Sequence, residues 1–153
     1  MRTRSQIYSE LVYGHIQQLK QAIDDEPNLE TKDILLKEAK QYGSLCHNFP
    51  LMVLRSGLSQ AVAFVWVKSK GEDNTAYGKF LKHLSQLTDR PENENVSGFQ
   101  QYINQAELIE YQRLTRKILS ASIWYKRFAE SVLGVKAGQE VPVDDEPKES
   151  DHA

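Results

Sequence analysis

Hydrophobic residues recur at steps of three and four along most of the chain, which is the spacing of an amphipathic helix. Residues 5 to 23 show this pattern first, and a polar stretch with a proline at residues 24 to 28 interrupts it. A second helix is predicted from about 31 to 46, with Asn48-Phe49-Pro50 as punctuation after it. The longest pattern covers residues 106 to 133 and predicts the last helix.

The central segment from Leu51 to Ser69 is the most apolar part of the sequence. Its stretch Ala61 to Val67, taken alone, fits a buried strand. The whole segment is longer than a typical strand, so we expect a central helix that begins at Pro50, because proline suits the first helical turn. Gly57 would then lie inside this helix at a cost of about 1 kcal/mol relative to alanine. We expect it to permit close approach of a neighbouring helix.

Three further segments complete the prediction. Residues 75 to 88 fit a fourth helix, residues 89 to 97 a flexible connection, and residues 99 to 103 a short helical turn. Neither strand-type alternation nor an internal repeat is present. The sequence therefore predicts an all-α fold, a compact single-domain bundle of about five to six helices over residues 1–136. Residues 137–153 are expected to form a disordered acidic tail, because they have little to bury.

Length and charge refine this picture. A chain of 153 residues suits one domain. In its last 14 residues six acidic side chains accompany one lysine, Lys148, so the tail carries about −5 and residues 1 to 139 about +3. The weakly basic body permits a polyanion partner. With neither a membrane-length apolar run nor a signal-type N-terminus, a cytoplasmic location is expected.

Residues that support catalysis are sparse. The single cysteine, Cys46, precedes His47, but neighbours on a helix point about 100° apart and make a poor nucleophile and base. His15, His47, His83 and His152 are scattered without the spacing of metal ligands. Phosphate-binding glycine loops and dinucleotide motifs are absent. We expect no enzyme activity, no metal and no cofactor.

The last predicted helix carries a basic face opposite its apolar stripe. Five of its residues project within about 80° of one another, and they are Arg113, Arg116, Ser120, Trp124 and Arg127. Lys117 adjoins this face, and Lys126 lies to one side. The arrangement offers several phosphate contacts. A merely solvated charged face is the competing interpretation.

A second basic face is predicted on the central helix. On a helical wheel Arg55, Ser59, Trp66 and Lys70 point away from the apolar stripe, and Lys68 lies at the helix end. Trp66 also fits a core position. On the fourth helix, Lys79 and Lys82 would add to this face if the two helices pack together.

Three segments resemble one protein family. They are Gly43 to Pro50 (GSLCHNFP) leading into Ser56 to Phe64 (SGLSQAVAF), Lys68 followed by Ala76-Tyr77, and EYQRLTR at 110–116 followed by WYKRFAE at 124–130. This pattern resembles the small all-helical subunit of the type III-B CRISPR effector complex, the Cmr complex. The likeness covers about residues 5 to 133. It departs at Tyr125, where an aliphatic residue is expected, and in the acidic tail.

The resemblance implies a role in an assembly. Copies of the subunit would stack head to tail beside RAMP-type backbone subunits and line the groove that holds guide RNA and target RNA, and RNA cleavage would belong to the backbone subunits. The implied phosphate contacts are Lys68, Arg113, Arg116, Lys117, Lys126 and Arg127. Secondary basic candidates are Arg55, Lys70, Lys79 and Lys82. Structural or interface roles fall to Gly57, Leu58, Gln60, Trp66 and Trp124.

Other functions fit the same residues. The main alternative is a helical protein-interaction module whose tryptophans dock another subunit without nucleic-acid contact. A small helical nuclease is a further alternative. A third hypothesis is that the acidic tail shields the basic face until assembly. Partners would be Cmr subunits, further copies of the chain, and RNA, with no membrane and no small-molecule substrate.

Overall fold

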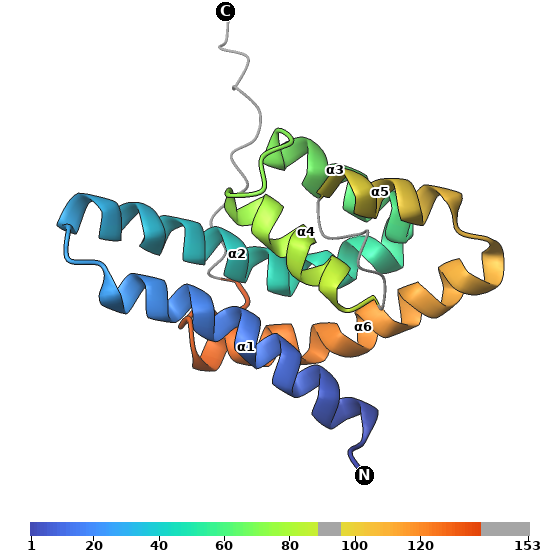
Figure 1. Cartoon of the computed structure of the whole chain (residues 1–153), viewed down its shortest axis with the longest axis horizontal. Helices are drawn as coiled ribbons and strands as arrows, with labels where there is room; N and C mark the ends of the chain where they lie inside the picture. Colours follow the sequence, from blue (N-terminus) through green and yellow to red (C-terminus); the bar gives the residue numbers. More distant parts are fainter. Residues whose placement is uncertain (89–95, 139–153) are drawn as a thin grey trace, which may run out of the picture.

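The computed structural model describes residues 1–88 and 96–138, apart from the side chain of Val96, and over these ranges the chain is all-α (Figure 1). The helices are α1 (Arg4–Asp25), α2 (Leu29–Ser56), α3 (Leu58–Ser69), α4 (Ala76–Gln86), α5 (Val96–Gln105) and α6 (Leu108–Ser131). The predicted fold class is confirmed. Residues 89–95 of the expected flexible connection lie outside the described residues. Residues 139–153 of the expected acidic tail also lie outside them.

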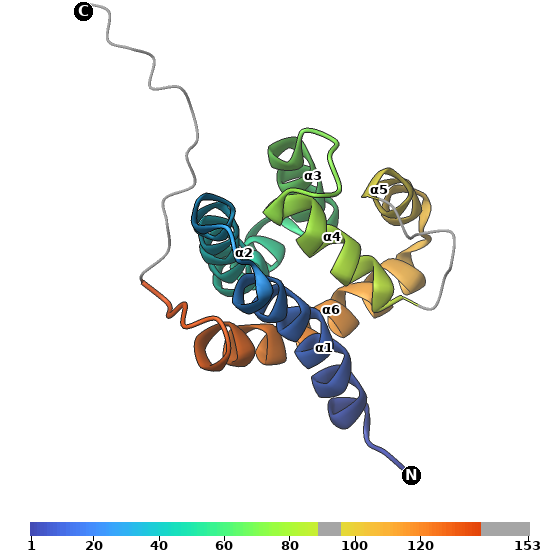
Figure 2. The ribbon, with the colours of Figure 1, turned by 60° about the vertical axis from the view of Figure 1, so that its left-hand side comes forward.

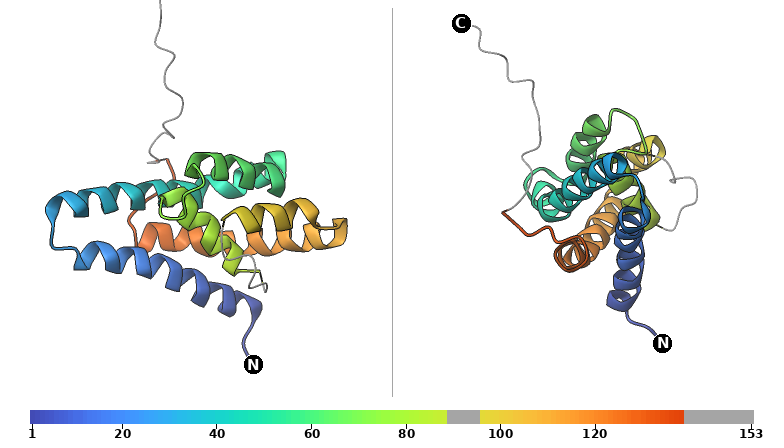
Figure 3. Two further views of the ribbon diagram at one scale, coloured as in Figure 1. Left: turned by 45° about the horizontal axis from the view of Figure 1, so that its top comes forward. Right: turned by 90° about the vertical axis from the view of Figure 1, so that its left-hand side faces the viewer.

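Helices α1, α2 and α6 form the long part of the molecule. The Thr3 hydroxyl accepts a hydrogen bond from the Gln6 backbone N–H, and the Gln6 side chain accepts one from Thr3 in return, so a capping box starts α1. The Asn28 side chain caps α2 by accepting hydrogen bonds from the Glu30 and Thr31 backbone amides. Helix α1 packs against both α2 and α6. The α1–α2 turn and the α5–α6 turn lie at opposite ends of the long axis (Figure 1; Figure 3, left).

The predicted helix boundary at Pro50 is wrong. Helix α2 continues through Pro50 to Ser56, and the chain breaks at Gly57 instead. There φ is 87° and ψ is 161°, a backbone conformation essentially restricted to glycine. Gly57 ends α2 by donating its N–H to the Val53 carbonyl at 2.8 Å and starts α3 by accepting from Ala61. Pro50 and its neighbour Phe49 are both buried in α2, so packing offsets the hydrogen bond that proline cannot donate.

Helices α3, α4 and α5 pack on one another and form a group beside the long part of the molecule (Figure 2). The hydroxyl of Thr75 caps α4 by accepting from the Gly78 amide at 3.0 Å. The region predicted as a short turn is a ten-residue helix, α5, which includes positions 96 and 97 of the expected connection. Its buried residues Phe99 and Ile103 lie one helical turn apart. The sequence pattern therefore predicted a single turn and not the whole helix.

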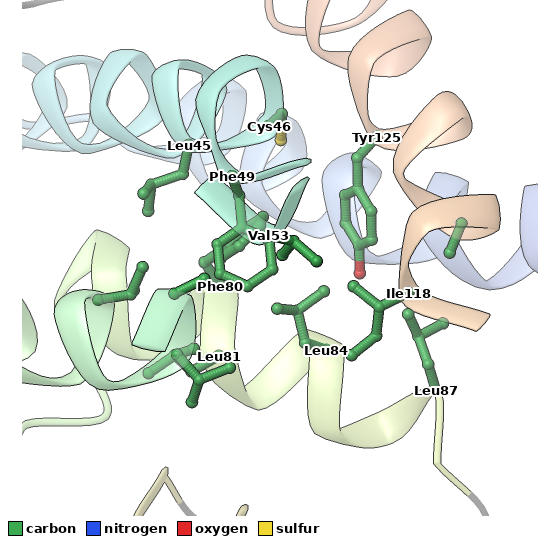
Figure 4. Packing of buried hydrophobic residues seen from close by; sticks show 14 of the residues in the cluster. Leu45, Cys46, Phe49, Val53, Phe80, Leu81, Leu84, Leu87, Ile118 and Tyr125 are labelled. Carbon is green, nitrogen blue, oxygen red and sulfur yellow. The ribbon is translucent and has the colours of Figure 1, made fainter. Parts of the chain in front are cut away.

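The core lies where α2, α4 and α6 meet. Phe49 and Phe80 pack edge to face with ring centroids 5.2 Å apart, and Tyr125 lies 5.7 Å from Phe80 (Figure 4). The predicted α6 stripe is confirmed at Leu114, Ile118, Ala121 and Tyr125, all buried. Five residues expected on apolar stripes are exposed: Ile7, Leu11, Leu36, Leu51 and Leu54. For the last two the cause is the break at Gly57, because a stripe drawn through it does not exist.

A buried polar group lies within this core, and we call it the ring cluster: His15, Tyr42, His83 and Tyr125. The two histidine rings stack with centroids 4.2 Å apart and planes 4° from parallel. Hydrogen bonds join Tyr42 Oη to His83 Nδ1 at 2.6 Å and Tyr125 Oη to His15 Nδ1 at 2.9 Å. The histidines that look scattered in the sequence thus include a contacting pair, which α1 and α4 bring together.

Burial controls the protonation of the ring cluster. Burial lowers the pKa of His15. Burial, and after it repulsion from a protonated His15 and from Lys79 and Lys82, lowers the pKa of His83 to about 3. Both rings are therefore neutral near neutral pH. Burial raises the pKa of Tyr42 and of Tyr125 well above the ordinary value, so both hydroxyls keep their protons.

Candidate nucleic-acid interface

Helix α6 presents a basic strip to solvent, which we define as Arg113, Arg116, Ser120, Trp124 and Arg127. Helices α1 and α2 pack on the opposite side of α6 and bury its apolar stripe. Within the strip the three arginines and Ser120 are exposed, and Trp124 is half-buried. Arg127 lies 14 positions after Arg113, and each helical residue rises about 1.5 Å, so the strip spans roughly 20 Å from its first arginine to its last.

The arginines of the basic strip are weakly neutralised. Arg116 and Arg127 have no ion-pair partner among residues 1–88 and 96–138. Arg113 lies 3.9 Å from Glu110, measured from Nη1 to Oε2, and its side chain remains 72% exposed. An ion pair of this length and exposure contributes little. The positive charge of the strip is therefore available to an anion.

The guanidinium group of Arg127 lies over the indole ring of Trp124. The guanidinium carbon of Arg127 lies 5.4 Å from the centre of the indole ring, and the indole stacks on Phe128 at 5.7 Å. A cation over an aromatic face is held in place without losing its charge. Trp124 also packs against the core, so one side of this ring is covered by its own chain.

A pocket lies beside the far end of the basic strip, between α2 and α6. Its volume is about 390 Å³, and its walls include Leu51, Ile123, Lys126 and Arg127. Lys126 is half-buried and has no ion-pair partner in the described part of the chain. Leu51 and Ile123 are 46% and 54% exposed. Lys117, the other lysine expected near the strip, is half-buried.

The lysines at the end of α3 lie apart from α6. Helix α3 packs against α2, α4 and α5. Only its start approaches α6, where the Ser59 backbone N–H donates to Tyr111 Oη at 2.9 Å. Lys68 lies about 14 Å further along α3 and sits 5.6 Å from the Phe64 ring, measured from Nζ to the centroid. Lys70 follows at the left-handed end of the helix.

The secondary basic candidates are spread over α2, the end of α3, and α4. Arg55 lies in the last turn of α2, so the break at Gly57 separates it from Trp66 and Lys70. Lys79 on α4 forms an ion pair with Glu38 of α2, with Nζ 3.3 Å from Oε2. Lys82 is exposed on α4. The wheel alignment that grouped Arg55 with the α3 residues assumed one continuous helix.

The residues expected to be structural divide by burial. Leu58 is fully buried, Trp66 packs half-buried against the core, and Gln60 is exposed. A Cβ at Gly57 would meet Tyr111 Oη at 3.2 Å. Close approach at Gly57 was expected, and the approaching group is the Tyr111 hydroxyl. Sequence reasoning placed Tyr111 on the apolar stripe and missed this contact, because a hydroxyl leaves no periodic signal.

The remaining reactive groups are enclosed or dispersed. Cys46 is buried, and burial raises the pKa of its thiol, which disfavours the thiolate. His47 Nε2 donates a hydrogen bond to the Val135 carbonyl at 2.8 Å. Residues 1–88 and 96–138 contain no group of three or more side chains placed to bind a metal ion. Over the same ranges, no helix combines the length and apolarity of a membrane span.

Comparison with known proteins gives consistent results. The profile of the family described as CRISPR-associated protein (Cas_Cmr5) matches residues 4–132. A curated protein of Thermus thermophilus, the CRISPR system Cmr subunit Cmr5, is 34% identical over 133 residues, covering 87% of this chain and 98% of its own. The crystal structure of a CRISPR-associated Cmr5 family protein, also from Thermus thermophilus, superposes with a TM-score of 0.61 at 29% identity, over 86% of this chain and 98% of that one.

Proposed function

The chain belongs to the Cmr5 family of CRISPR-associated proteins, and on that premise we propose that it is the small subunit of a type III-B Cmr complex that holds RNA along α6. Other Cmr subunits would be its partners, as the name of the Thermus relative indicates for that protein. In this role the chain supplies binding surface and spacing. RNA cleavage belongs to other subunits of the complex.

The basic strip is the observation that carries this proposal. Three guanidinium groups line one exposed face of a rigid helix, and the strip is about as long as three to four nucleotides of an extended strand. Guanidinium groups bind phosphate oxygens in bidentate geometry and need no particular base sequence. A guide-dependent complex needs contacts of this kind, because base pairing already supplies the sequence specificity.

Exposed apolar residues at the two ends of the long axis support head-to-tail stacking. Leu29 and Ile34 follow the α1–α2 turn and are 78% and 59% exposed. Leu108 and Ile109 follow the α5–α6 turn at the opposite end and are 69% and 73% exposed (Figure 1). When one end of a copy contacts the other end of the next copy, both apolar groups become buried and the row stays open for growth. We propose these four residues as the stacking contacts.

The body of the domain extends to residue 136 in this proposal. Val135 is buried against α2, and its backbone is held from both sides: its N–H donates to the Ala129 carbonyl at 2.9 Å, and its carbonyl accepts from His47. Lys136 is exposed. We therefore place the boundary between body and tail after residue 136.

The decisive experiment reverses the charge of the basic strip inside the assembled complex. We expect R113E/R116E/R127E to abolish RNA retention by this subunit, measured by crosslinking to a target RNA. Its matched control, R4E/K37E/K40E, reverses three exposed cations on α1 and α2 and changes the net charge equally. The control should retain RNA. Thermal unfolding of both variants should match the parent chain, because the six side chains lie on the surface.

Salt dependence separates phosphate binding from a protein-only interface. Each phosphate contact to a single strand contributes about −0.7 to the slope of log affinity against log salt, so loss of three contacts should reduce the slope by about 2. If the strip variant keeps its RNA crosslinks and its salt slope, the assignment of RNA to α6 is wrong. RNA cleavage by the purified chain with Mg²⁺ or Mn²⁺ would contradict the non-catalytic role.

Stacking is tested at the apolar ends. Ile109→Asp places a charge at one proposed contact and should reduce the number of copies per complex, measured by native mass spectrometry. Val67→Asp is the matched control, since Val67 is 72% exposed and lies on α3, away from both turns. An unchanged copy number for Ile109→Asp would contradict stacking through the α5–α6 end.

A further inference from the structure

The pocket between α2 and α6 lies where the described chain ends. After α6 the backbone turns at Gly134, where φ is 72°, and passes toward α2 (Figure 1). The Val135 side chain then fills the space above Gly43, where an added Cβ would lie only 2.6 Å from it. Ala137 lines the pocket itself. Gly138, the last described residue, therefore follows directly after a residue of the pocket wall.

The chemistry of the pocket matches the sequence that follows. The pocket lining includes two half-exposed apolar side chains, Leu51 and Ile123, two cations, Lys126 and Arg127, and one carboxylate, Glu130. The sequence after Gly138 brings the apolar run Val141-Pro142-Val143 and then the acidic run Asp144-Asp145-Glu146. Apolar and acidic groups thus follow in a fixed order a few residues from a site that holds apolar side chains and two cations against one carboxylate.

The connecting length allows this contact. Val143 lies five positions after Gly138, and an extended chain covers at most about 3.6 Å per position, or roughly 18 Å. Ala137 already lies in the pocket wall, so Leu51 and Ile123 are within the reach that this chain length allows. A tether this short gives an effective concentration on the order of millimolar, which is enough to populate a contact that would be weak between separate molecules.

We propose that the pocket between α2 and α6 is a docking site for the acidic C-terminal segment of the same chain, which covers Lys126 and Arg127 and competes there with RNA. In this contact Val141 and Val143 would pack on Leu51 and Ile123. The three carboxylates at 144–146 would bind Lys126 and Arg127. The competition rests on the proposed function, because Arg127 also belongs to the basic strip. The docking contact stands without it.

Docking is measured first, without RNA, in the full chain. A nitroxide label is attached at Ser150→Cys, and Cys46 is changed to Ala to prevent labelling of the parent thiol. In the ¹⁵N-labelled chain we expect selective broadening of the amides of Leu51, Ile123, Lys126 and Arg127. The broadening should vanish in D144N/D145N/E146Q and be retained in E140Q/E149Q/D151N, which removes the same number of charges from other tail positions.

Two results would overturn the docking contact. The first is absence of selective broadening at the pocket. The second is equal loss of broadening in both charge variants, which would indicate diffuse attraction and no seated segment. Nitroxide-labelled chain without ¹⁵N is then mixed with ¹⁵N-labelled chain without nitroxide. This mixture shows whether the segment in the pocket belongs to the same chain or to a second copy. Broadening that is as strong in this mixture places the segment in a second copy and refutes docking within one chain.

RNA binding then tests competition. If the segment occupies the pocket two-thirds to nine-tenths of the time, releasing it raises the apparent RNA affinity about three- to ten-fold. We expect this gain for D144N/D145N/E146Q in the assembled complex, and a smaller gain for E140Q/E149Q/D151N. Docking without any gain in RNA affinity would refute competition and count against RNA on α6. If R113E/R116E/R127E loses RNA binding and the chain with these arginines intact shows no broadening at the pocket, docking is refuted and the proposed function stands.

Discussion

Two regions of α6 differ in almost every physical property although they share one helix. Tyr125 is 1% exposed and belongs to the ring cluster, whereas its neighbour Arg127 is exposed and belongs to the basic strip. The ring cluster joins four helices through stacked rings and hydrogen bonds. The arginines of the basic strip face solvent, and their contacts are with the Trp124 indole and, at 3.9 Å, with Glu110. One helix therefore separates the residues that hold the fold from those that are available to a partner.

The difference shows what kind of change each region tolerates. Polar groups in the ring cluster are buried and depend on one another, so removing one leaves another without a partner. Cations in the basic strip make few contacts with their own chain, Arg127 with the Trp124 indole and Arg113 with Glu110 at 3.9 Å, so their removal should affect mainly what binds them. Mutations in the two regions should therefore separate stability from RNA binding.

Tyr125→Ala should have the largest effect. It removes a fully buried ring that contacts Phe80 and binds His15, and we expect the free energy of unfolding to fall by about 3–5 kcal/mol. Urea denaturation measures the loss. Tyr125→Phe keeps the ring and removes the hydroxyl, so it should cost about 1–2 kcal/mol and remain folded. A loss in Tyr125→Ala no greater than that in Tyr125→Phe would show that the ring itself contributes nothing.

Acid should weaken the ring cluster next. Burial and nearby positive charge lower the pKa of His83 from 6.5 to about 3, so the unfolded chain binds a proton that the folded chain rejects. Stability from this group is complete above pH 6.5 and falls as the pH falls toward 3. Between pH 7 and pH 5 the loss is about 2 kcal/mol, and His15 acts in the same direction.

Chemical denaturation at a series of pH values measures this effect. His83→Gln removes the titrating ring and should flatten the dependence of the unfolding free energy on pH, whatever its own stability at pH 7. R113E/R116E/R127E lies in the basic strip and should keep the slope of the parent chain. An equally steep slope in His83→Gln would show that other groups cause the acid sensitivity.

The sequence predicted the helices well where a stripe of apolar residues was unbroken. On α6 the stripe from Leu114 to Tyr125 is buried as expected. The prediction failed at Pro50 and Gly57, because local propensity marks both residues as breakers and only packing decides between them. The buried ring of Phe49 holds α2 together through Pro50, whereas the combination of φ 87° and ψ 161° at Gly57 is essentially restricted to glycine.

Contacts between distant residues could not be predicted in the same way. His15 and His83 carry no shared motif, and their stacking depends on how α1 and α4 cross α2. Helical spacing placed the arginines of the basic strip on one face, since that requires only the geometry of a single helix. It does not predict how far Lys68 lies from them, because that distance depends on which helices α3 packs against.

Arg116→Ala tests the basic strip alone. The side chain is exposed and has no ion-pair partner in the described chain, so stability should change by about 0.5 kcal/mol or less. RNA affinity of the assembled complex should fall about three- to ten-fold through the loss of one phosphate contact. Filter binding at two salt concentrations and urea denaturation measure the two quantities. A large loss of stability without a loss of affinity would reverse the roles assigned to the two regions.

Glu110→Gln should have the smallest effect and the opposite sign. The carboxylate lies 3.9 Å from Arg113, and its other oxygen accepts a hydrogen bond from the Tyr102 hydroxyl at 2.8 Å. Glutamine keeps an acceptor for Tyr102 and removes the charge, so stability should stay within about 0.5 kcal/mol and RNA affinity should rise about two-fold. Glu10→Gln is the matched control, because it removes a carboxylate paired with Arg2 at the start of α1, outside the basic strip. If both variants raise RNA affinity equally, the gain reflects net charge alone, and Glu110 does not restrain Arg113.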